Sequence, residues 1–187
     1  MALRPTAGFM ISHPAHWIAL GFGAGLSPKA PGTVIMKEAG TVGVKAVAAK
    51  DNIIAVKIKS TRMLLAYGFL RKIFEVFEKY KTPIDMVTTS EVAVSVTIDS
   101  DLHLDEIIAE LSNIASIEVE KNQTIISIVG NEIAKTDAVL TKLFDAINEI
   151  PVTMVSYGGS HHNISLLIPS EYKTKTLQLV NKGLFNL

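Results

Sequence analysis

An internal repeat constrains the fold of this chain more than any other feature of its sequence. When the second half is set against the first with a shift of about 70 residues, similar segments meet in the same order. Each copy contains an apolar strand pattern, a helix pattern, two more strand patterns and a second amphipathic helix. The aligned pairs are Ile53–Ser60 with Ile125–Gly130, Arg71–Lys79 with Thr141–Glu149, Met86–Ile98 with Met154–Ile168, and Leu104–Leu111 with Tyr172–Phe185. The chain is therefore expected to contain two copies of one structural unit.

The spacing of apolar residues predicts which face of the first helix is buried. Phe69, Ile73 and Phe77 recur every four residues, and Leu70 and Phe74 stand at adjoining positions. These residues form one broad apolar stripe, because positions four apart lie on the same face of a helix. A stripe of this width must cover a sheet.

The order of elements predicts an α+β fold with two ferredoxin-like βαββαβ units. The first copy gains its last strand at Ile117–Glu120, whereas the second copy ends before a corresponding strand. An unassigned strand pattern at Val44–Lys50 precedes the first copy and is the natural candidate to complete the second sheet. The two units are therefore expected to be interleaved.

The domain boundaries follow from this interleaving. The first unit is expected over residues 52–120, and the second over residues 44–51 and 121–187. Residues 27–43 contain two prolines and several glycines and are expected to be a linker. Residues 1–26 are expected to be an N-terminal segment that is non-native or a remnant of something larger.

Composition excludes several classes of partner. Eighteen basic residues balance eighteen acidic ones, and a chain without a basic surplus is not expected to bind nucleic acid. The chain has no cysteine, so it forms no disulfide and no thiolate zinc site, which fits a reducing cytoplasm. The longest early apolar run, at 9–26, is interrupted by His13, Pro14 and His16 and falls short of the roughly 20 apolar residues of a membrane span. We therefore expect a cytoplasmic protein that does not span a membrane.

Two places in the first copy could bind a small molecule. Gly68 stands at the expected start of a helix, where free backbone amides attract an anion such as a carboxylate. Asp85 and Glu91 flank a turn rich in hydroxyl groups, and two carboxylates could hold two ammonium groups. The same residues also fit a tightly packed loop and an ordinary polar turn, so both interpretations stay open at this point.

No catalytic or metal site is expected. His161 and His162 are adjacent, and neighbouring residues of a strand point to opposite faces, so these two cannot easily share one ion. No serine, histidine and acid combination with the pattern of a catalytic triad occurs, and no cofactor motif is expected. The sequence favours a binding module over an active site.

Two long segments carry a family resemblance. The run STRMLLAYGFLRKIFEVFEKYKTPIDMVTTSEVAVSVTID (60–99), followed by SYGGSHHNISLLIP (156–169), closely resembles the C-terminal regulatory half of lysine-sensitive aspartokinases. The resemblance covers about Pro31–Leu187. It implies two ACT domains, which are amino-acid-sensing units with the split βαββαβ fold, and it implies the same interleaving.

The resemblance also implies an effector site in the first unit, at an interface between two chains. Carried over residue by residue, this site would use Met63, Ala66, Gly68, Phe69, Leu70, Ile84, Asp85, Thr89, Ser90 and Glu91. Threonine-sensing relatives tend to carry a Gln-Asn pair after the second strand, whereas this chain has TTSE (88–91), which favours lysine. Lysine offers one carboxylate for the helix amides and two ammonium groups for Asp85 and Glu91. A sensor of threonine or another amino acid is the alternative.

The resemblance stops short of a kinase. Aspartokinases begin with an amino-acid-kinase domain that opens on a Lys-Phe-Gly-Gly-like motif, which is absent here, and only HPA at 13–15 echoes the family before residue 27. We therefore expect a non-catalytic regulatory part of aspartate kinase that binds L-lysine as feedback inhibitor and forms a homodimer through the first unit. An alternative is a regulatory subunit that joins a separate kinase chain.

Overall fold

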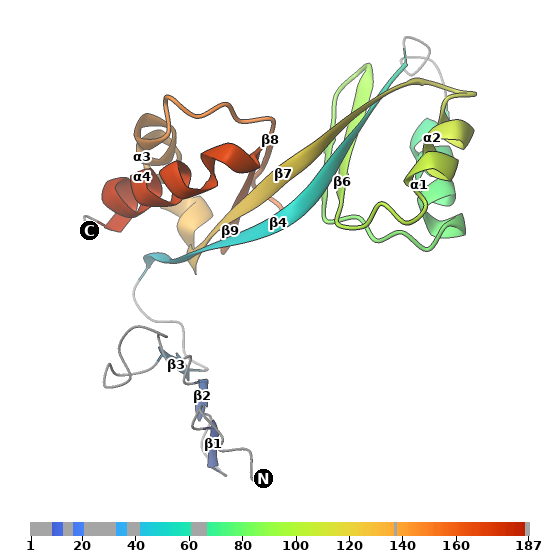
Figure 1. Cartoon of the computed structure of the whole chain (residues 1–187). Helices are drawn as coiled ribbons and strands as arrows, with labels where there is room; N and C mark the ends of the chain where they lie inside the picture. Colours follow the sequence, from blue (N-terminus) through green and yellow to red (C-terminus); the bar gives the residue numbers. More distant parts are fainter. Residues whose placement is uncertain are drawn as a thin grey trace, which may run out of the picture. The chain divides into compact units, whose positions relative to one another are not determined.

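The computed structural model describes residues 42–60, 67–136 and 138–185 with their side chains, and before them the backbone of three short strands. It divides into two compact units, Met1–Val42 and Gly43–Leu187, each with its own sheet (Figure 1). Among the described residues, no helix is long and apolar enough to cross a membrane.

The N-terminal unit contains a three-stranded antiparallel sheet. Its strands are β1 (Phe9–Ser12), β2 (Trp17–Leu20) and β3 (Thr33–Met36), with β2 in the middle. Strand β3 lies inside residues 27–43, the stretch for which we predict a linker, so this stretch contains one paired strand.

The C-terminal unit is built on a six-stranded antiparallel sheet with the order β5-β6-β4-β7-β9-β8. Its strands are β4 (Gly43–Lys59), β5 (Met86–Thr89), β6 (Ala93–Ile98), β7 (Ser116–Asn131), β8 (Met154–Ser156) and β9 (Asn163–Pro169). Its α-helices are α1 (Phe69–Lys79), α2 (Leu104–Leu111), α3 (Val139–Ala146) and α4 (Lys173–Phe185), and the short 3₁₀ helices are η2 (Ile133–Lys135) and η3 (Ser170–Tyr172).

The two central strands, β4 and β7, each run through two lobes (Figure 1). The first lobe consists of the later half of β4, then α1, β5, β6, α2 and the earlier half of β7. The second lobe consists of the later half of β7, then α3, β8, β9, α4 and the earlier half of β4, which pairs with β7 from Gly43 opposite Asn131 to Lys50 opposite Ile125. This architecture confirms the predicted α+β fold of two interleaved ferredoxin-like units.

The structure joins strands that the sequence separates. We predict Val44–Lys50 and Ile53–Ser60 as two strands, but they form the single 17-residue strand β4. Register shifts interrupt the pairing with β7 around Ile53, where Asn52 adopts φ 60° and Asn122 of β7 adopts φ 57°. Asparagine tolerates this left-handed conformation better than most residues. The two strands therefore continue through the junction of the lobes with bulges instead of ending there.

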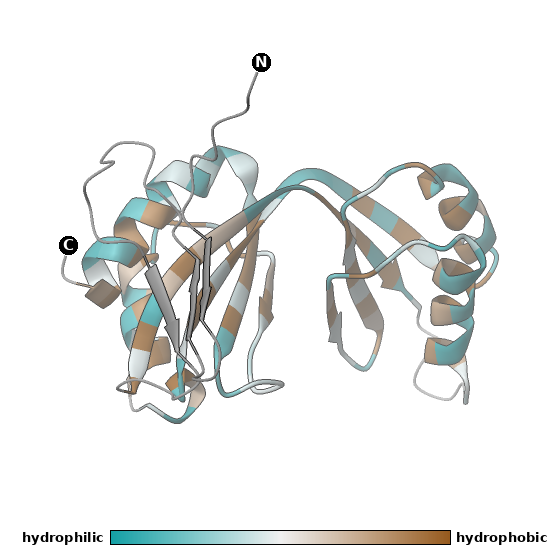
Figure 2. Cartoon of the chain, turned by 90° about the horizontal axis from the view of Figure 1, so that it is seen from below, coloured by the Kyte–Doolittle hydropathy of each residue, from teal (hydrophilic) through white to brown (hydrophobic). Residues whose placement is uncertain are grey.

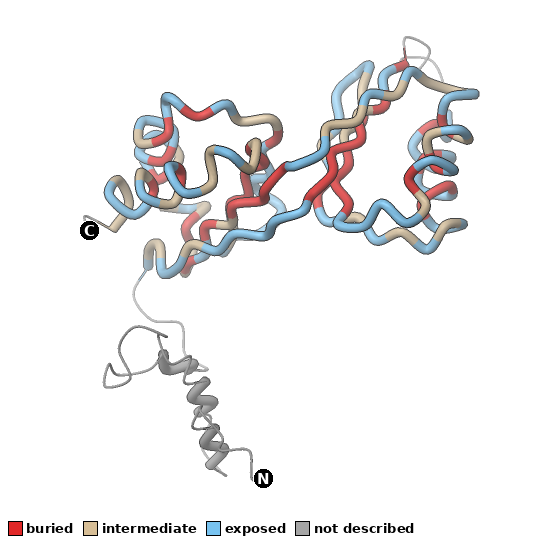
Figure 3. Tube along the Cα trace, viewed as in Figure 1, coloured by how far each residue is buried: buried red, intermediate tan, exposed pale blue. Residues whose placement is uncertain are grey.

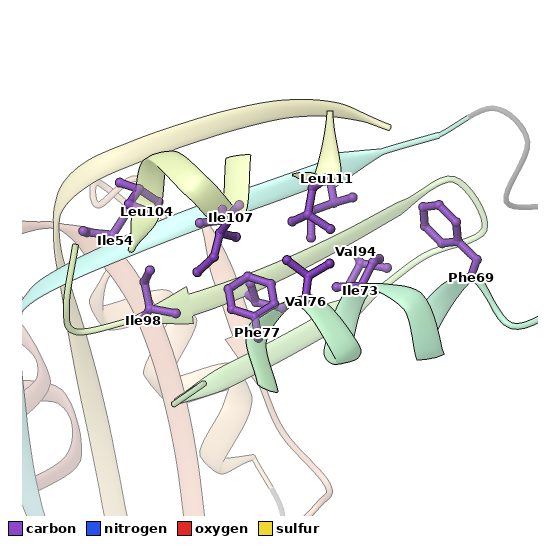
Figure 4. Packing of buried hydrophobic residues seen from close by; sticks show 13 residues of the cluster. Ile54, Phe69, Ile73, Val76, Phe77, Val94, Ile98, Leu104, Ile107 and Leu111 are labelled. Carbon is purple, nitrogen blue, oxygen red and sulfur yellow. The ribbon is translucent and has the colours of Figure 1, made fainter. Parts of the chain in front are cut away.

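In the first lobe, α1 and α2 cover one face of the sheet (Figures 2 and 4). The buried cluster is formed by Ile54, Val56 and Ile58 of β4, Phe69, Ile73, Val76 and Phe77 of α1, Val94, Val96 and Ile98 of β6, and Leu104, Ile107 and Leu111 of α2. The alternation along β6 places every second side chain against the helices. The second lobe repeats the arrangement with α3 and α4, and in both lobes the buried residues follow the central strands and the inner helix faces (Figure 3).

The apolar stripe on α1 is narrower than the sequence indicates. Phe69, Ile73 and Phe77 are buried, but Leu70 and Phe74 remain 40% and 39% exposed. The adjoining positions of the stripe therefore lie beyond the area that one sheet covers, and they leave apolar surface on the outside of the first lobe.

A small third cluster lies on the sheet face away from the helices, where the lobes meet. It consists of Ile53, Ala55, Met86, Ile125, Met154 and Leu167, all of them buried. Met86 begins β5 and Met154 begins β8, so the cluster takes the matching residue from each copy of the repeat. This contact ties the two edge strands to the junction.

Candidate effector site in the first lobe

The start of α1 is open to a ligand. Gly68 precedes the helix with φ 80° and ψ 10°, and because it is a glycine it offers no side-chain cap to the helix start. A Cβ atom added at Gly68 would meet nothing within 4 Å, so the backbone conformation, not crowding, favours glycine here. Because the first amides of a helix have no partner within it, this end of α1 can receive a carboxylate.

The residues that we predict for the site before and at the start of α1 fall into two groups. Phe69 is buried in the core of the first lobe, and Leu70 is half-exposed beside it. Met63 and Ala66 lie outside the described residues.

The turn between β5 and β6 lies at the same end of the first lobe as the start of α1. Thr89 is the last residue of β5, and the Ser90 amide donates to the carbonyl of Ala93 at 2.8 Å, which closes the turn around exposed Glu91. Next to this turn, the Ser60 amide donates to the carbonyl of Val92 at 2.9 Å. The end of β4, the turn and the start of α1 therefore share one region of the surface.

A hollow at this end of the lobe brings further residues together. It is lined by Lys59 and Ser60 of β4 and its end, Tyr67, Phe69 and Lys72 around the start of α1, Val92 and Ala93 after the turn, and Ser112–Ser116 between α2 and β7. Of the predicted site residues that the structure describes, only Phe69 lines this hollow, and sequence reasoning did not predict the two lysines or the segment after α2. Lys72 could have been found from the sequence, because it stands in the first turn of a helix that a glycine precedes. The segment after α2 could not, because only the order of strands in the sheet brings it to this region.

Ile84 and Asp85 lie at the opposite end of β5. The Asp85 amide donates to the carbonyl of Thr97 at 2.9 Å, and Ile84 packs half-buried against the core under the helices. From Asp85 to Ser90 the chain advances five residues, or about 17 Å at the usual rise of a strand. The two predicted carboxylates, Asp85 and Glu91, thus lie at opposite ends of β5, farther apart than the two ammonium groups of one lysine, so a single ligand does not reach both within one chain.

The carboxylate of Asp85 has a partner within the chain. The Lys50 ammonium Nζ lies 2.7 Å from Asp85 Oδ1 and 2.9 Å from Asp99 Oδ2. The hydrogen bond to Asp85, followed by the one to Asp99, raises the pKa of Lys50, and the hydrogen bond from Lys50 lowers the pKa of Asp99. Lys50 is therefore protonated and Asp99 ionised at neutral pH.

The matching corner of the second lobe is closed by internal contacts. The Tyr157 hydroxyl donates to the carbonyl of Ala134 at 2.7 Å, and the Glu132 amide donates to His162 Nδ1 at 3.3 Å. Among the described residues, no group of three or more histidine, aspartate or glutamate side chains is arranged to hold a metal ion. The glycine before α1 and the carboxylate in the turn after β5 thus distinguish the first lobe, since Ala138 stands before α3.

Comparison with known proteins assigns the class of this fold. A family model for the ACT domain matches residues 126–184, which is the second lobe without its strand from β4. A solved structure described as a C-terminal regulatory domain of aspartate kinase from Porphyromonas gingivalis W83 is 46% identical, covers 75% of this chain and 97% of that one, and has a TM-score of 0.68. The chain is thus an ACT-type regulatory region.

Two longer proteins agree with this class. Aspartokinase 3 of Arabidopsis thaliana, a chloroplastic protein, is 34% identical over 85% of this chain and 31% of its own length. The structure of Escherichia coli aspartokinase III in complex with lysine and aspartate is 29% identical over 85% of this chain and 38% of that one, with a TM-score of 0.74. The chain belongs to the aspartokinase family and corresponds to its C-terminal regulatory region. The chain spans 31%, 32% and 44% of the length of three curated relatives that it matches.

Proposed function

We propose that the first lobe binds L-lysine and that binding regulates an aspartokinase by feedback inhibition in the synthesis of the aspartate-family amino acids lysine, threonine and methionine. The observation that carries the proposal is that the start of α1 beside Gly68 and the polar turn that contains Glu91 lie at the same end of the lobe, around a hollow lined by Phe69 and Val92. The helix start attracts a carboxylate and the turn attracts an ammonium group, so this end of the lobe suits a free amino acid.

Lysine fits better than a neutral amino acid because it carries a second ammonium group. Asp85, at the far end of β5, offers the second carboxylate. In this proposal the ligand lies at the interface between two copies of the first lobe, where Asp85 of one copy can lie near Glu91 of the other, and the site uses Met63, Ala66, Gly68, Phe69, Leu70, Ile84, Asp85, Thr89, Ser90 and Glu91. The complex of Escherichia coli aspartokinase III with lysine and aspartate supports this choice through its similarity to the chain.

The proposal includes a homodimer that forms through the first lobe. Leu70 and Phe74 on α1 and Val87 on the edge strand β5 are each about 40% exposed, so apolar surface remains next to unpaired strand groups. The charges of α1 change sign along the helix, and Arg71 pairs with Glu75 while Lys79 pairs with Glu110. A two-fold contact between copies would therefore rest on the apolar side chains and the strand edge.

In this proposal the chain does not catalyse a reaction and needs no cofactor. It acts on an aspartokinase catalytic domain, in the cytoplasm, by favouring one arrangement of the dimer. The strength of this control is bounded by the difference in lysine affinity between the two arrangements.

Titration calorimetry of the chain against L-lysine tests the proposal. We expect saturable binding of lysine, weaker or no binding of L-threonine and L-methionine, and no tight binding of ATP. A preference for threonine would support the alternative sensor instead. No binding of any of the three amino acids would overturn the assignment of the first lobe as an effector site.

A further inference from the structure

Lys50 occupies a particular place at the junction of the lobes. It is the last residue of β4 before the bulge and lies opposite Ile125 of β7. Its ammonium group is shared between two carboxylates, with 2.7 Å to Asp85 and 2.9 Å to Asp99. Asp85 precedes β5 and Asp99 follows β6, so one lysine side chain bridges neighbouring ends of the first-lobe strands.

The Lys50 ammonium occupies the position beside Asp85 that the ammonium group of a ligand would need. The group that pairs with Asp85 is a primary ammonium, which is the same chemical group that lysine would bring. A carboxylate oxygen can accept further hydrogen bonds, but a second cation beside Lys50 would be repelled by the first. A ligand ammonium at Asp85 must therefore displace Lys50 or weaken its bond.

Displacing the Lys50 ammonium from Asp85 costs little free energy, because Lys50 is exposed and has a second carboxylate partner. The side chains of Lys50 and Asp85 are 46% and 27% exposed, so exchange leaves no buried, unpaired charge. Asp99 is already in contact with Lys50 and can keep it paired after Asp85 is taken. Asp99 can therefore hold the Lys50 side chain after a ligand has taken its place at Asp85.

We propose that Lys50 is an internal competitor for the ligand ammonium at Asp85, and that Asp99 sets how readily Lys50 gives way. This inference rests on the proposed function, which places Asp85 in the lysine site. It assigns to Lys50 and Asp99, neither of which belongs to the proposed set of site residues, a role in tuning the affinity of that site.

Titration of L-lysine into four variants tests the inference. Lys50→Met should bind lysine about two- to five-fold more tightly, the range that an exposed ion pair supports. Asp99→Asn should bind about two- to five-fold more weakly, because Lys50 then holds Asp85 alone. The double variant should bind like Lys50→Met. Lys57→Met is the matched control, since it removes the same charge from β4 and breaks an ion pair with Glu120, and it should bind like the parent.

The possible results separate the inference from the proposed function. Equal affinities of the parent and Lys50→Met would overturn the competitor role and leave lysine binding intact. An Asp99→Asn effect of equal size with and without Lys50 would also overturn it, because the effect would then be a general change of potential. Absence of binding in every variant would overturn the proposed function, and the inference with it.

Discussion

At the scale of single residues, both lobes have a left-handed residue directly before their first helix, but the residue type differs. The residue before α1 is Gly68 with φ 80°, and the residue before α3 is Ala138 with φ 62°. Both helices thus start from a left-handed residue, a conformation that costs a residue with a Cβ atom roughly 1–2 kcal/mol. Glycine at the first position removes that cost and leaves the helix start uncovered.

We expect Gly68→Ala to lower the free energy of unfolding by about 1 kcal/mol, because the space is open and only the backbone conformation opposes the new methyl group. Urea denaturation measures this difference. In the second lobe, Ala138→Gly should not lower the free energy of unfolding by a similar amount, because glycine adopts the left-handed conformation without strain. A Gly68→Ala variant as stable as the parent would mean that the left-handed conformation before α1 carries no strain.

Each of the two carboxylates of the proposed site can be tested by its own substitution. Replacing Asp85 or Glu91 with alanine should weaken lysine binding by about 10- to 150-fold, or roughly 1.5–3 kcal/mol, if each accepts a charged hydrogen bond from the ligand. For Asp85 the loss should fall toward the low end, because Lys50 already competes for this carboxylate. Calorimetry with Asp145→Ala of the second lobe as control measures both. A variant that binds like the parent would remove its residue from the site.

At the scale of secondary structure elements, the long strands β4 and β7 hold the lobes together. Each contributes one half to each lobe, and each passes the junction through an asparagine with positive φ. The bulges keep the apolar sides of both halves facing their own helices, since a strand without them would carry its side-chain alternation unchanged across the junction.

Asn52→Val should therefore destabilise the chain by about 1–3 kcal/mol, because a β-branched residue is strongly disfavoured at φ 60°. Asn52→Gly should change stability far less, since glycine adopts this conformation freely. Thermal and urea unfolding of both variants provide the comparison. If valine and glycine behave alike at this position, the bulge does not depend on the left-handed residue.

At the scale of the whole molecule, the repeat supplies an internal control for the dimer. Phe74 on α1 and Phe144 on α3 occupy matching positions of the two copies, and they are 39% and 40% exposed. The proposed dimer uses the first lobe alone. Only Phe74 should then contribute to association.

Sedimentation velocity should show a dimer for the parent chain, with lysine raising the dimer fraction at low protein concentration. The coupling between lysine and dimer formation is expected to be about 1–3 kcal/mol. Phe74→Ser should lower the dimer fraction, whereas Phe144→Ser should not. A chain that binds lysine while it remains monomeric at all concentrations would contradict a site shared between two copies.

The sequence by itself determined the repeat, the order of elements and the interleaving of the units. These follow from local patterns, such as the four-residue spacing of Phe69, Ile73 and Phe77, which any helix packed on a sheet must show. The two candidate regions at Gly68 and at the turn before Glu91 were also visible, because glycine and clustered polar residues are local signals. The proposal of lysine as ligand came from the family resemblance, and the chemistry of the residues agrees with it.

Only the tertiary structure decided how these pieces meet. Pairing across the sheet makes one strand of residues 43–59, leaves Leu70 and Phe74 outside the core, and places Asp85 and Glu91 at opposite ends of β5. It also brings Lys50 to Asp85 and Asp99, which lie 35 and 49 positions further along the chain. Contacts between residues so far apart depend on strand order and register, and the local sequence around a single lysine carries neither.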